Sequence, residues 1–207
     1  MSTTTETTAP AEPSAFGGRL LIGATGAGAV ALLPAYISAL RAHFTGTVTV
    51  FMTHTATRFL PPHTVALFAD RVVTGESADT WPRDNHVSLA AEHDLVTVLP
   101  ATAHTLSAVA AGAAPHLLAA TVLQATAPVV FFPVMSAEMW GTAAVRRNIA
   151  QLRADGHEIV DPVRGSRYDV GLGTFVEGPL PVPPPRFVAE VRTRLEARAR
   201  QAAPAAG

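Results

Sequence analysis

Cysteine is absent from this chain, and its absence excludes several kinds of chemistry. Without a thiol, the protein has no disulfide framework, no thiolate ligand for a metal ion, and no cysteine nucleophile or redox carrier of its own. Charge is sparse as well, because only 15% of the 207 residues are charged and the formal net charge is −1. A chain without a basic face has no general electrostatic attraction for nucleic acid or for an anionic membrane, so we expect neither as a partner.

Targeting and membrane-spanning signals are missing too. Residues 1–18 are rich in Thr, Ala, Pro and Glu, with neither a cationic start nor an apolar stretch of signal-peptide length, so we expect a disordered arm and a cytoplasmic location. The uncharged run from Leu20 to Leu40 is interrupted by glycines and by Pro34 and has no flanking membrane anchors. It therefore predicts a buried strand and helix and no membrane span.

Hydrophobic residues, by contrast, make up 48% of the chain. Short uncharged strands alternate with helical segments, which predicts a single α/β domain: a doubly wound, Rossmann-like (flavodoxin-like) parallel sheet with helices on both faces. So much apolar surface with so little charge also predicts a homo-oligomer. Strands are expected at 19–23, 47–52, 71–73, 95–99, 129–132 and 157–160, and helices at 26–43, 53–59, 63–69, 86–92, 102–112, 115–125 and 139–154.

The chain changes character after the predicted domain, which we place at residues 19–178 with a glycine-containing loop at 163–178. Residues 179–185, PLPVPPP, predict a stiff, extended linker. The segment 186–201 predicts an amphipathic helix packed on the edge of the domain, so that 179–207 is a linker followed by a C-terminal helix. The apolar side of this helix consists of Phe187, Val188, Val191 and Leu195.

Two polar turns follow the first two predicted strands. The glycine-rich turn Gly23–Gly28, GATGAG, opens a helix, and Thr53 and Thr55 follow the second strand. Ligands of a doubly wound sheet collect at the carboxyl ends of the strands, where backbone amides, a helix dipole and hydroxyl groups can bind a phosphate. The turn has neither the Lys-Ser/Thr of a nucleotide-hydrolase loop nor the spacing of a dinucleotide motif. A plain tight turn, and helix capping by Thr53, stay open as structural alternatives.

His86 is the candidate for proton transfer, because an imidazole exchanges protons near neutral pH. It follows Asn85 in a polar loop and precedes an apolar strand that leads into Pro100–Thr105, PATAHT. The other histidines form no metal-ligand pattern, and without cysteine or a carboxylate array we expect no metal site. The sequence also lacks the G-x-S-x-G elbow of a hydrolase triad.

Large, soft side chains gather where the strand at 129–132 ends. The tract Phe131–Trp140, FFPVMSAEMW, places Met135, Met139 and Trp140 at a strand-to-helix junction. Such side chains suit a flat ring or a thioether-sized substrate. The alternative is that methionine and tryptophan at helical spacing belong to the core.

His86, the PATAHT turn and the tract Pro133–Trp140 together resemble the flavin-dependent cysteine decarboxylases. The marks of that family are an active-site histidine, a P-A-S-A-N-T turn and a P-x-M-N-x-x-M-W segment. The resemblance runs from about Leu20 to about Phe187. It is nearest to the enzymes that decarboxylate the C-terminal cysteine of a ribosomally made precursor peptide, giving the aminoenethiol from which aminovinyl-cysteine rings of lanthipeptides and linaridins are built.

The resemblance implies an FMN cofactor and assigns a role to each motif. His86 would be catalytic, and a flap at 163–178 would close over the substrate. The pocket would be completed by a neighbouring subunit of a trimer, possibly within a dodecamer. Cofactor contacts would come from Gly23, Thr25, Gly26, Ala27, Thr53 and Thr55 around the phosphate, and from Pro100, Ala101, Thr102 and His104 around the ring. Substrate contacts would come from Asn85, Met135, Ser136, Met139 and Trp140.

The implied chemistry explains why a flavin is needed. A plain cysteine carboxylate has no electron sink for the carbanion that remains when carbon dioxide departs. Oxidation of the thiol and its neighbouring carbon gives a thioaldehyde beta to the carboxylate, and loss of carbon dioxide then gives an enethiolate. The protein contributes orientation, a base and a dry pocket. Oxygen is a candidate for reoxidising the flavin.

Two residues depart from the family pattern. His104 and Ser136 stand where the family has asparagine, and the second asparagine is expected to hold the substrate carboxylate. Serine has a shorter reach and lacks the second group of the amide. Three explanations stay open: His104 or an arginine of the 163–178 loop takes over the role, the substrate differs, or the chain binds flavin without turnover.

Rival functions follow from the same resemblance. A phosphopantothenoylcysteine decarboxylase needs a cysteine to direct reduction of the enethiol, and this chain has none. Flavin prenyltransferases lack the histidine and P-A-S-A-N-T signatures. A flavin-binding partner subunit without catalytic activity is the rival from a different class.

Overall fold

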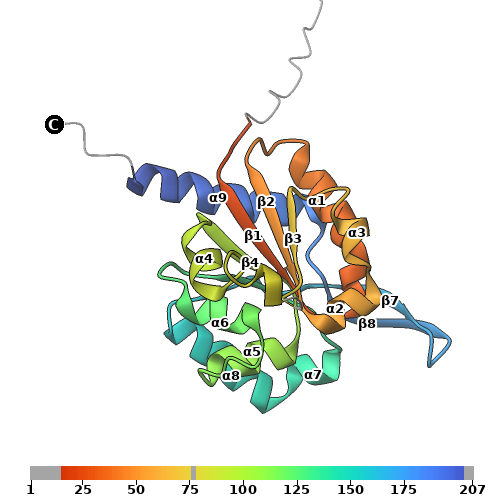
Figure 1. The fold of residues 1–207 in the computed structure, drawn as a ribbon. Coiled ribbons are helices and arrows are strands. Elements are labelled where there is room, and N and C mark those ends of the chain that lie inside the picture. The colour runs from red at the N-terminus through yellow and green to blue at the C-terminus, as the bar shows by residue number, and fades with distance from the viewer. Residues whose placement is uncertain (1–14, 76–77, 203–207) are drawn as a thin grey trace, which may run out of the picture.

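The computed structural model describes residues 15–75 and 78–202, and its centre is a six-stranded parallel sheet in the order β3-β2-β1-β4-β5-β6 (Figure 1). Helices lie on both faces of the sheet, so the predicted doubly wound α/β fold is confirmed. Most of the predicted N-terminal arm, residues 1–14, lies outside the described residues. The strands are β1 (Arg19–Ala24), β2 (Thr47–Met52), β3 (Arg71–Val73), β4 (Leu95–Ala101), β5 (Val130–Pro133) and β6 (Glu158–Ile159).

The central strands β4 and β5 are buried along their whole length because both faces of the sheet are covered. All seven residues of β4 are buried, as are all four of β5. Alternate residues point to opposite sides, so that Leu20 and Ile22 pack with α1 (Leu33–Arg41) and α9 (Pro184–Ala202), whereas Leu21 packs on the other face. That other face is covered by α4 (His86–Ala91), α5 (Ala103–Ala110), α6 (Leu117–Gln124) and α8 (Ala143–Ala154).

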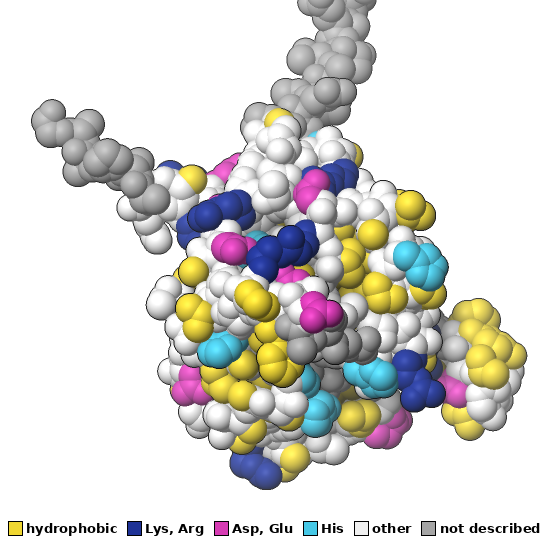
Figure 2. Space-filling view, viewed as in Figure 1, with side chains coloured by type: hydrophobic (Ala, Val, Ile, Leu, Met, Phe, Trp, Pro, Cys, Tyr) yellow, Lys and Arg dark blue, Asp and Glu magenta, His cyan; other side chains and the backbone are white. Residues whose placement is uncertain are grey.

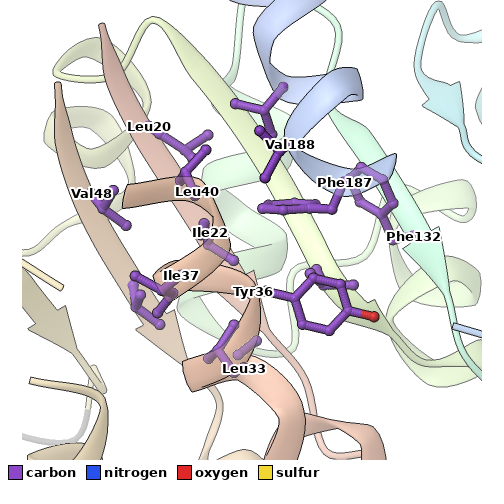
Figure 3. Packing of buried hydrophobic residues seen from close by; sticks show 14 of the residues in the cluster. Leu20, Ile22, Leu33, Tyr36, Ile37, Leu40, Val48, Phe132, Phe187 and Val188 are labelled. Atoms are coloured by element: carbon purple, nitrogen blue, oxygen red, sulfur yellow. The ribbon is translucent and has the colours of Figure 1, made fainter. Parts of the chain in front are cut away.

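The C-terminal helix is part of the main core. Phe187 on α9 is fully buried, and its ring makes edge contacts with Tyr36 and Phe132 at centroid distances of 5.6 and 5.1 Å (Figure 3). The hydroxyl group of Tyr36 donates a hydrogen bond to the carbonyl of Val182, just before the helix. The predicted apolar side of the helix is therefore confirmed, but the helix packs on a face of the sheet, and the predicted edge position is wrong.

Helix boundaries differ from the predictions where the backbone changes direction. The segment predicted as one helix at 26–43 consists of a 3-10 turn, η1 (Gly28–Leu32), followed by α1 with Pro34 in its first turn. The helix predicted at 139–154 is two helices, α7 (Ala137–Gly141) and α8, because Thr142 is extended at ψ 145° and its hydroxyl caps α8. The remaining helices are α2 (His54–Phe59), α3 (Pro62–Val65) and η2 (Ala78–Thr80). Within the described ranges, none of the helices has the length and apolarity needed to cross a membrane.

Residues 163–178, predicted as a loop, form most of an antiparallel hairpin. Strands β7 (Val163–Asp169) and β8 (Thr174–Leu180) pair along seven residues, and the turn contains Gly173 at φ +63°. The hairpin projects from the body of the protein, and hydrophobic side chains cover its tip (Figures 1 and 2). Those side chains are Tyr168, Val170, Leu172 and Phe175, and each is more than half exposed.

Three partly buried histidines make the stability depend on pH. Burial lowers the pKa values of His93, His116 and His157 below the ordinary value of 6.5. As the pH falls below that value, the unfolded state binds more protons than the folded state, so the stabilisation present above it is lost. We expect the Tm to decrease as the pH is lowered from about 7 to about 5. Thermal unfolding across that range tests this, and His157→Gln should flatten the profile; a Tm that stays constant in the wild type would contradict it.

Candidate active site

A crevice opens where the strand order reverses, between the carboxyl ends of β1 and β4. Thr25, directly after β1, donates a hydrogen bond from its hydroxyl group to the carbonyl of Pro100 at 2.7 Å. The backbone N–H of Thr102, directly after β4, donates to the same hydroxyl oxygen at 3.0 Å. These bonds tie the two strand ends together at the switch point, which is where open α/β sheets bind their ligands.

The crevice contains a cavity of about 320 Å³. Its lining comes from the turns after three strands and from the residue before α6. Apart from Gly26, every lining residue is a threonine or a histidine. The lining residues are Thr25, Gly26, Thr53, His54, Thr55, Thr102, His104, Thr105 and His116. We call this the threonine cavity.

Two of the threonines also cap helices. The hydroxyl oxygen of Thr53 accepts from the backbone N–H of Ala56 at 3.4 Å, and that of Thr102 accepts from Thr105 at the same distance. The capping role that the sequence left open for Thr53 is therefore present. Both threonines line the cavity as well as capping their helices, and the hydroxyl group of Thr53 also donates to the carbonyl of Ala24 at 3.4 Å.

Gly26 brings the first turn into direct contact with α2. A Cβ atom at this position would lie 2.3 Å from Cγ2 of Thr55, far inside van der Waals contact. The β-branched side chain of Thr55 is stiff, and therefore only glycine permits this approach. Because both residues line the threonine cavity, the close contact shapes the cavity itself.

Replacing Gly26 with alanine should therefore distort the threonine cavity. Either Thr55 or the turn must move, and we expect the affinity for the bound ligand to fall by about tenfold or more, equivalent to about 1.4 kcal/mol. Flavin titration of the variant tests this. Gly28 provides the control, since a Cβ atom there meets nothing within 4 Å. Equal losses in Gly26→Ala and Gly28→Ala would contradict the steric argument.

His116 contributes an unpartnered polar atom to the site. Its Nδ1 accepts the backbone N–H of Ala119 at 3.1 Å, which caps α6, whereas its Nε2 is buried without a hydrogen-bond partner. Burial, and next the charge of His104 6.2 Å away between ring centroids, lowers the pKa of His116. The ring is thus neutral at pH 7, with its proton on Nε2. Sequence reasoning did not assign His116 to the site, because only the packing of α6 brings it there.

His86 lies at a second cavity, of about 400 Å³. It is the first residue of α4, and the side chain of Asn85 caps that helix by accepting from the N–H of Ser88 at 3.0 Å. Leu117 lines this cavity and the preceding residue, His116, lines the threonine cavity, so the start of α6 contacts both. The residues around His86 are Gly75, Trp81, Asp84, Asn85 and Leu117.

Asp84, which lines the His86 cavity, is a buried acid. Only 3% of it is exposed, and its carboxylate accepts hydrogen bonds from Arg71 and, at 3.0 Å, from Nε of Arg83. Burial opposes ionisation of Asp84, but the bonds from Arg83 and Arg71 outweigh it and lower the pKa of the carboxyl group. The residue is therefore an anion at neutral pH, held in the loop that leads to His86.

The Met-Trp tract lies after β5, apart from the threonine cavity. Met135 packs against the core, Met139 is 45% exposed, and Ser136 caps α7 by accepting from the N–H of Met139 at 3.3 Å. Trp140 lines a third cavity, of about 280 Å³, together with Arg146, Ile149, Ala150, Arg153 and Asp161. Within one chain, the structure does not bring these predicted substrate residues to the cavity of the predicted cofactor residues.

The predicted cofactor residues fall into two groups. Four do not line the threonine cavity: Gly23 lies in β1 against Leu118, Ala27 precedes η1, and Pro100 and Ala101 end β4. Six predicted residues do line it, and His54, Thr105 and His116 join them. The six are Thr25, Gly26, Thr53, Thr55, Thr102 and His104.

In the described part of the chain, no cluster of three or more potential metal-ligating side chains occurs.

The Flavoprotein family model matches residues 11–178 of this chain. Among curated proteins, the mersacidin decarboxylase of Bacillus sp. (strain HIL-Y85/54728) is 36% identical over 156 residues, which are 75% of this chain and 79% of that protein. The coenzyme A biosynthesis bifunctional protein CoaBC of Mycobacterium bovis is 42% identical over 133 residues, or 63% of this chain, but this match spans only 32% of CoaBC.

Two solved structures of cysteine decarboxylases have the same fold as this chain. The FMN-dependent cysteine decarboxylase SpaF is 31% identical, with a TM-score of 0.69 over 87% of this chain and 97% of its own. The peptidyl-cysteine decarboxylase EpiD is 25% identical, with a TM-score of 0.73 over 84% of this chain and 99% of its own. The resemblance that the motifs carry is confirmed by these matches.

Proposed function

Because this chain belongs to the Flavoprotein family, we propose that it is an FMN-dependent enzyme that oxidatively decarboxylates the C-terminal cysteine of a ribosomally made precursor peptide. The product would be an aminoenethiol for aminovinyl-cysteine formation, as in lanthipeptides and linaridins. One observation carries the proposal: the threonine cavity lies at the β1/β4 switch point of a chain that shares 36% identity with a decarboxylase over 79% of that relative's length.

The residues of the threonine cavity fit FMN. Thr55 offers a hydroxyl donor for a phosphate, and Gly26 leaves room that a side chain would fill. The hydroxyl groups of Thr25 and Thr53 already donate to the carbonyls of Pro100 and Ala24, and these residues shape the cavity wall. On the side of α5 and α6, Thr102 and the neutral ring of His116 adjoin the space that an isoalloxazine ring would take. When bound, FMN supplies the two-electron oxidation that makes the cysteine side chain an electron sink for decarboxylation.

The protein's own contribution is orientation and proton transfer. His86, at the first turn of α4, would accept a proton from the substrate, because an imidazole exchanges protons at the pH of the cell. The side chains of Leu117 and of Trp81, which is 58% exposed, give the same cavity an apolar border.

A peptide substrate is supported by the hairpin. Its base packs near α7, since a Cβ atom at Gly178 would lie 3.5 Å from that of Ala137. Its tip offers exposed apolar side chains that an extended peptide can cover. Arg164 and Arg167 lie on β7 and are candidates for binding the substrate carboxylate, the role in which Ser136 replaces an asparagine of the family.

Assembly into homo-oligomers belongs to the same proposal. Phe59, Leu67 and Trp81 are large apolar side chains with exposed fractions above one half, on a chain with little charge. We expect trimers, possibly assembled into a dodecamer, in which a neighbouring subunit brings substrate residues to the cofactor. Light scattering on the purified protein measures the mass of the particle.

The decisive experiment uses synthetic peptides that end in cysteine. With wild-type protein, FMN and oxygen, such a peptide should lose the mass of carbon dioxide plus two hydrogens. The matched control peptide ends in cysteine amide, which has no free carboxylate and should stay unchanged. Flavin binding with every cysteine peptide unchanged would favour the partner-subunit alternative and overturn the proposed activity.

The likeness to CoaBC favours phosphopantothenoylcysteine decarboxylation as the second candidate. Against it stands the absence of cysteine, the residue needed to direct reduction of the enethiol in that reaction. Incubation with phosphopantothenoylcysteine in parallel with the peptides separates the two candidates. Turnover of the small substrate alone would replace the peptide assignment.

A further inference from the structure

One arginine of the sheet holds both ends of the helix that begins at His86. Arg71 lies on the edge strand β3 and points its guanidinium toward α4. One terminal nitrogen, Nη2, binds the carboxylate of Asp84, two residues before the helix. The other, Nη1, binds Glu92 at its C-terminal cap, at 2.9 Å. The fork geometry of a guanidinium suits such a bridge, because its donors are fixed relative to one another.

This arrangement is costly enough to call for a reason. Asp84 is nearly fully buried, and Nε of Arg71 is buried without a hydrogen-bond partner. Burying charges costs more than an isolated ion pair returns in stability, so such pairs are better explained by the geometry they fix. Here the fixed element is α4, a helix of only six residues that on its own would not hold its first turn in place.

The other contacts of this segment converge on the same place. The backbone N–H of Asp84 donates to the carbonyl of Thr80 at 2.6 Å, and the side-chain amide of Asn85 donates to the carbonyl of Trp81 at 3.1 Å. On the core side, Leu89 is fully buried. Within residues 15–75 and 78–202, the ion pairs of Arg71 connect this compact turn to the sheet through side-chain charges.

We propose that Arg71 is a positioning residue for His86: by binding Asp84 before α4 and Glu92 after it, the guanidinium fixes the imidazole at the reacting carbon of the substrate. The inference rests on the proposed function, in which His86 moves a proton. It predicts that loss of the bridge lowers the rate of the chemical step and leaves substrate and cofactor binding intact, because Arg71 lines neither cavity.

The test compares Arg71→Lys with a matched control. Lysine keeps the charge but cannot bridge two carboxylates with a rigid fork. Arg194 on α9, on the opposite face of the sheet from α4, bridges Glu158 and Glu190 at 2.6 Å each. Arg194→Lys therefore measures the general cost of losing an arginine bridge between two carboxylates. For Arg71→Lys we expect kcat to fall about tenfold or more, with KM and the FMN dissociation constant within about twofold. Arg194→Lys should leave kcat unchanged.

Two further measurements separate positioning from folding. Added guanidinium should restore part of the kcat of Arg71→Ala, because it can occupy the vacated site between the two carboxylates. Amide hydrogen exchange should speed up in α4 of Arg71→Lys and leave α9 unchanged. Where Arg71→Ala does not fold, Glu92→Gln removes the charge at one end of the bridge, on a half-exposed side chain, and should give a smaller loss of kcat.

The inference is overturned if kcat of Arg71→Lys equals that of the wild type, or if both lysine variants lose kcat equally. If the wild-type protein converts no cysteine peptide, the proposed function has failed. The exchange measurement then still decides whether Arg71 fixes α4, and unchanged exchange in Arg71→Lys would refute the bridge on its own.

Discussion

Replacement of His86 by asparagine should abolish turnover of a cysteine-terminated peptide while bound FMN stays in place. A positioned general base typically contributes 10²–10⁴-fold to the rate, and we expect a loss in roughly that range. Asparagine preserves a polar side chain of similar size at the start of α4 but cannot accept and release a proton. The cofactor should remain because His86 does not line the threonine cavity.

Two measurements on His86→Asn check this expectation: the visible absorption spectrum of the bound flavin and the rate at which peptide mass decreases. His63, exposed on α3, supplies the control, since His63→Asn changes a histidine outside both cavities. Full activity in His86→Asn would remove His86 from the mechanism. Loss of the flavin along with activity would instead give His86 a cofactor-binding role.

The sheet could be predicted from the sequence because its strands are buried on both sides. Runs such as Leu95–Leu99 contain no charge and are short, which is typical of a strand covered on both faces. The hairpin at 163–180 could not be predicted in this way. Its strands contain Arg164, Arg167 and Glu177 and have no buried residue, so neither face carries the apolar alternation of a packed strand.

The candidate site was predictable to the extent that it depends on strand ends. Thr25, Thr53 and Thr102 directly follow strands, and any parallel sheet brings such residues to one edge. His116 could not be placed, because its position depends on the packing of Leu118 against Gly23 beneath α6. Arg71 is a similar case, since an arginine on a three-residue strand gives no local sign that it bridges residues 13 and 21 positions later.

Truncation of Phe187 to alanine should cost about 3–5 kcal/mol of unfolding free energy, the usual loss for a fully buried aromatic ring. Phe187 is 0% exposed and fills the space between Tyr36 on α1 and Phe132 on β5. Its loss leaves a cavity that these two aromatic rings cannot close, because each is fixed by its own helix or strand (Figure 3). The prediction treats α9 as part of the central core, although it comes after a proline-rich stretch.

Chemical denaturation of Phe187→Ala, followed by circular dichroism, measures this loss. Phe175 gives the matched control: it is the same residue type at 68% exposure on the hairpin, so Phe175→Ala should change the unfolding free energy by no more than about 0.5 kcal/mol. A loss for Phe187→Ala as small as that of the control would mean that α9 can leave the sheet without unfolding it. A large loss of unfolding free energy would mean instead that α9 is an essential part of the hydrophobic core. The flavoprotein fold of this chain then extends past the family match, which ends at residue 178.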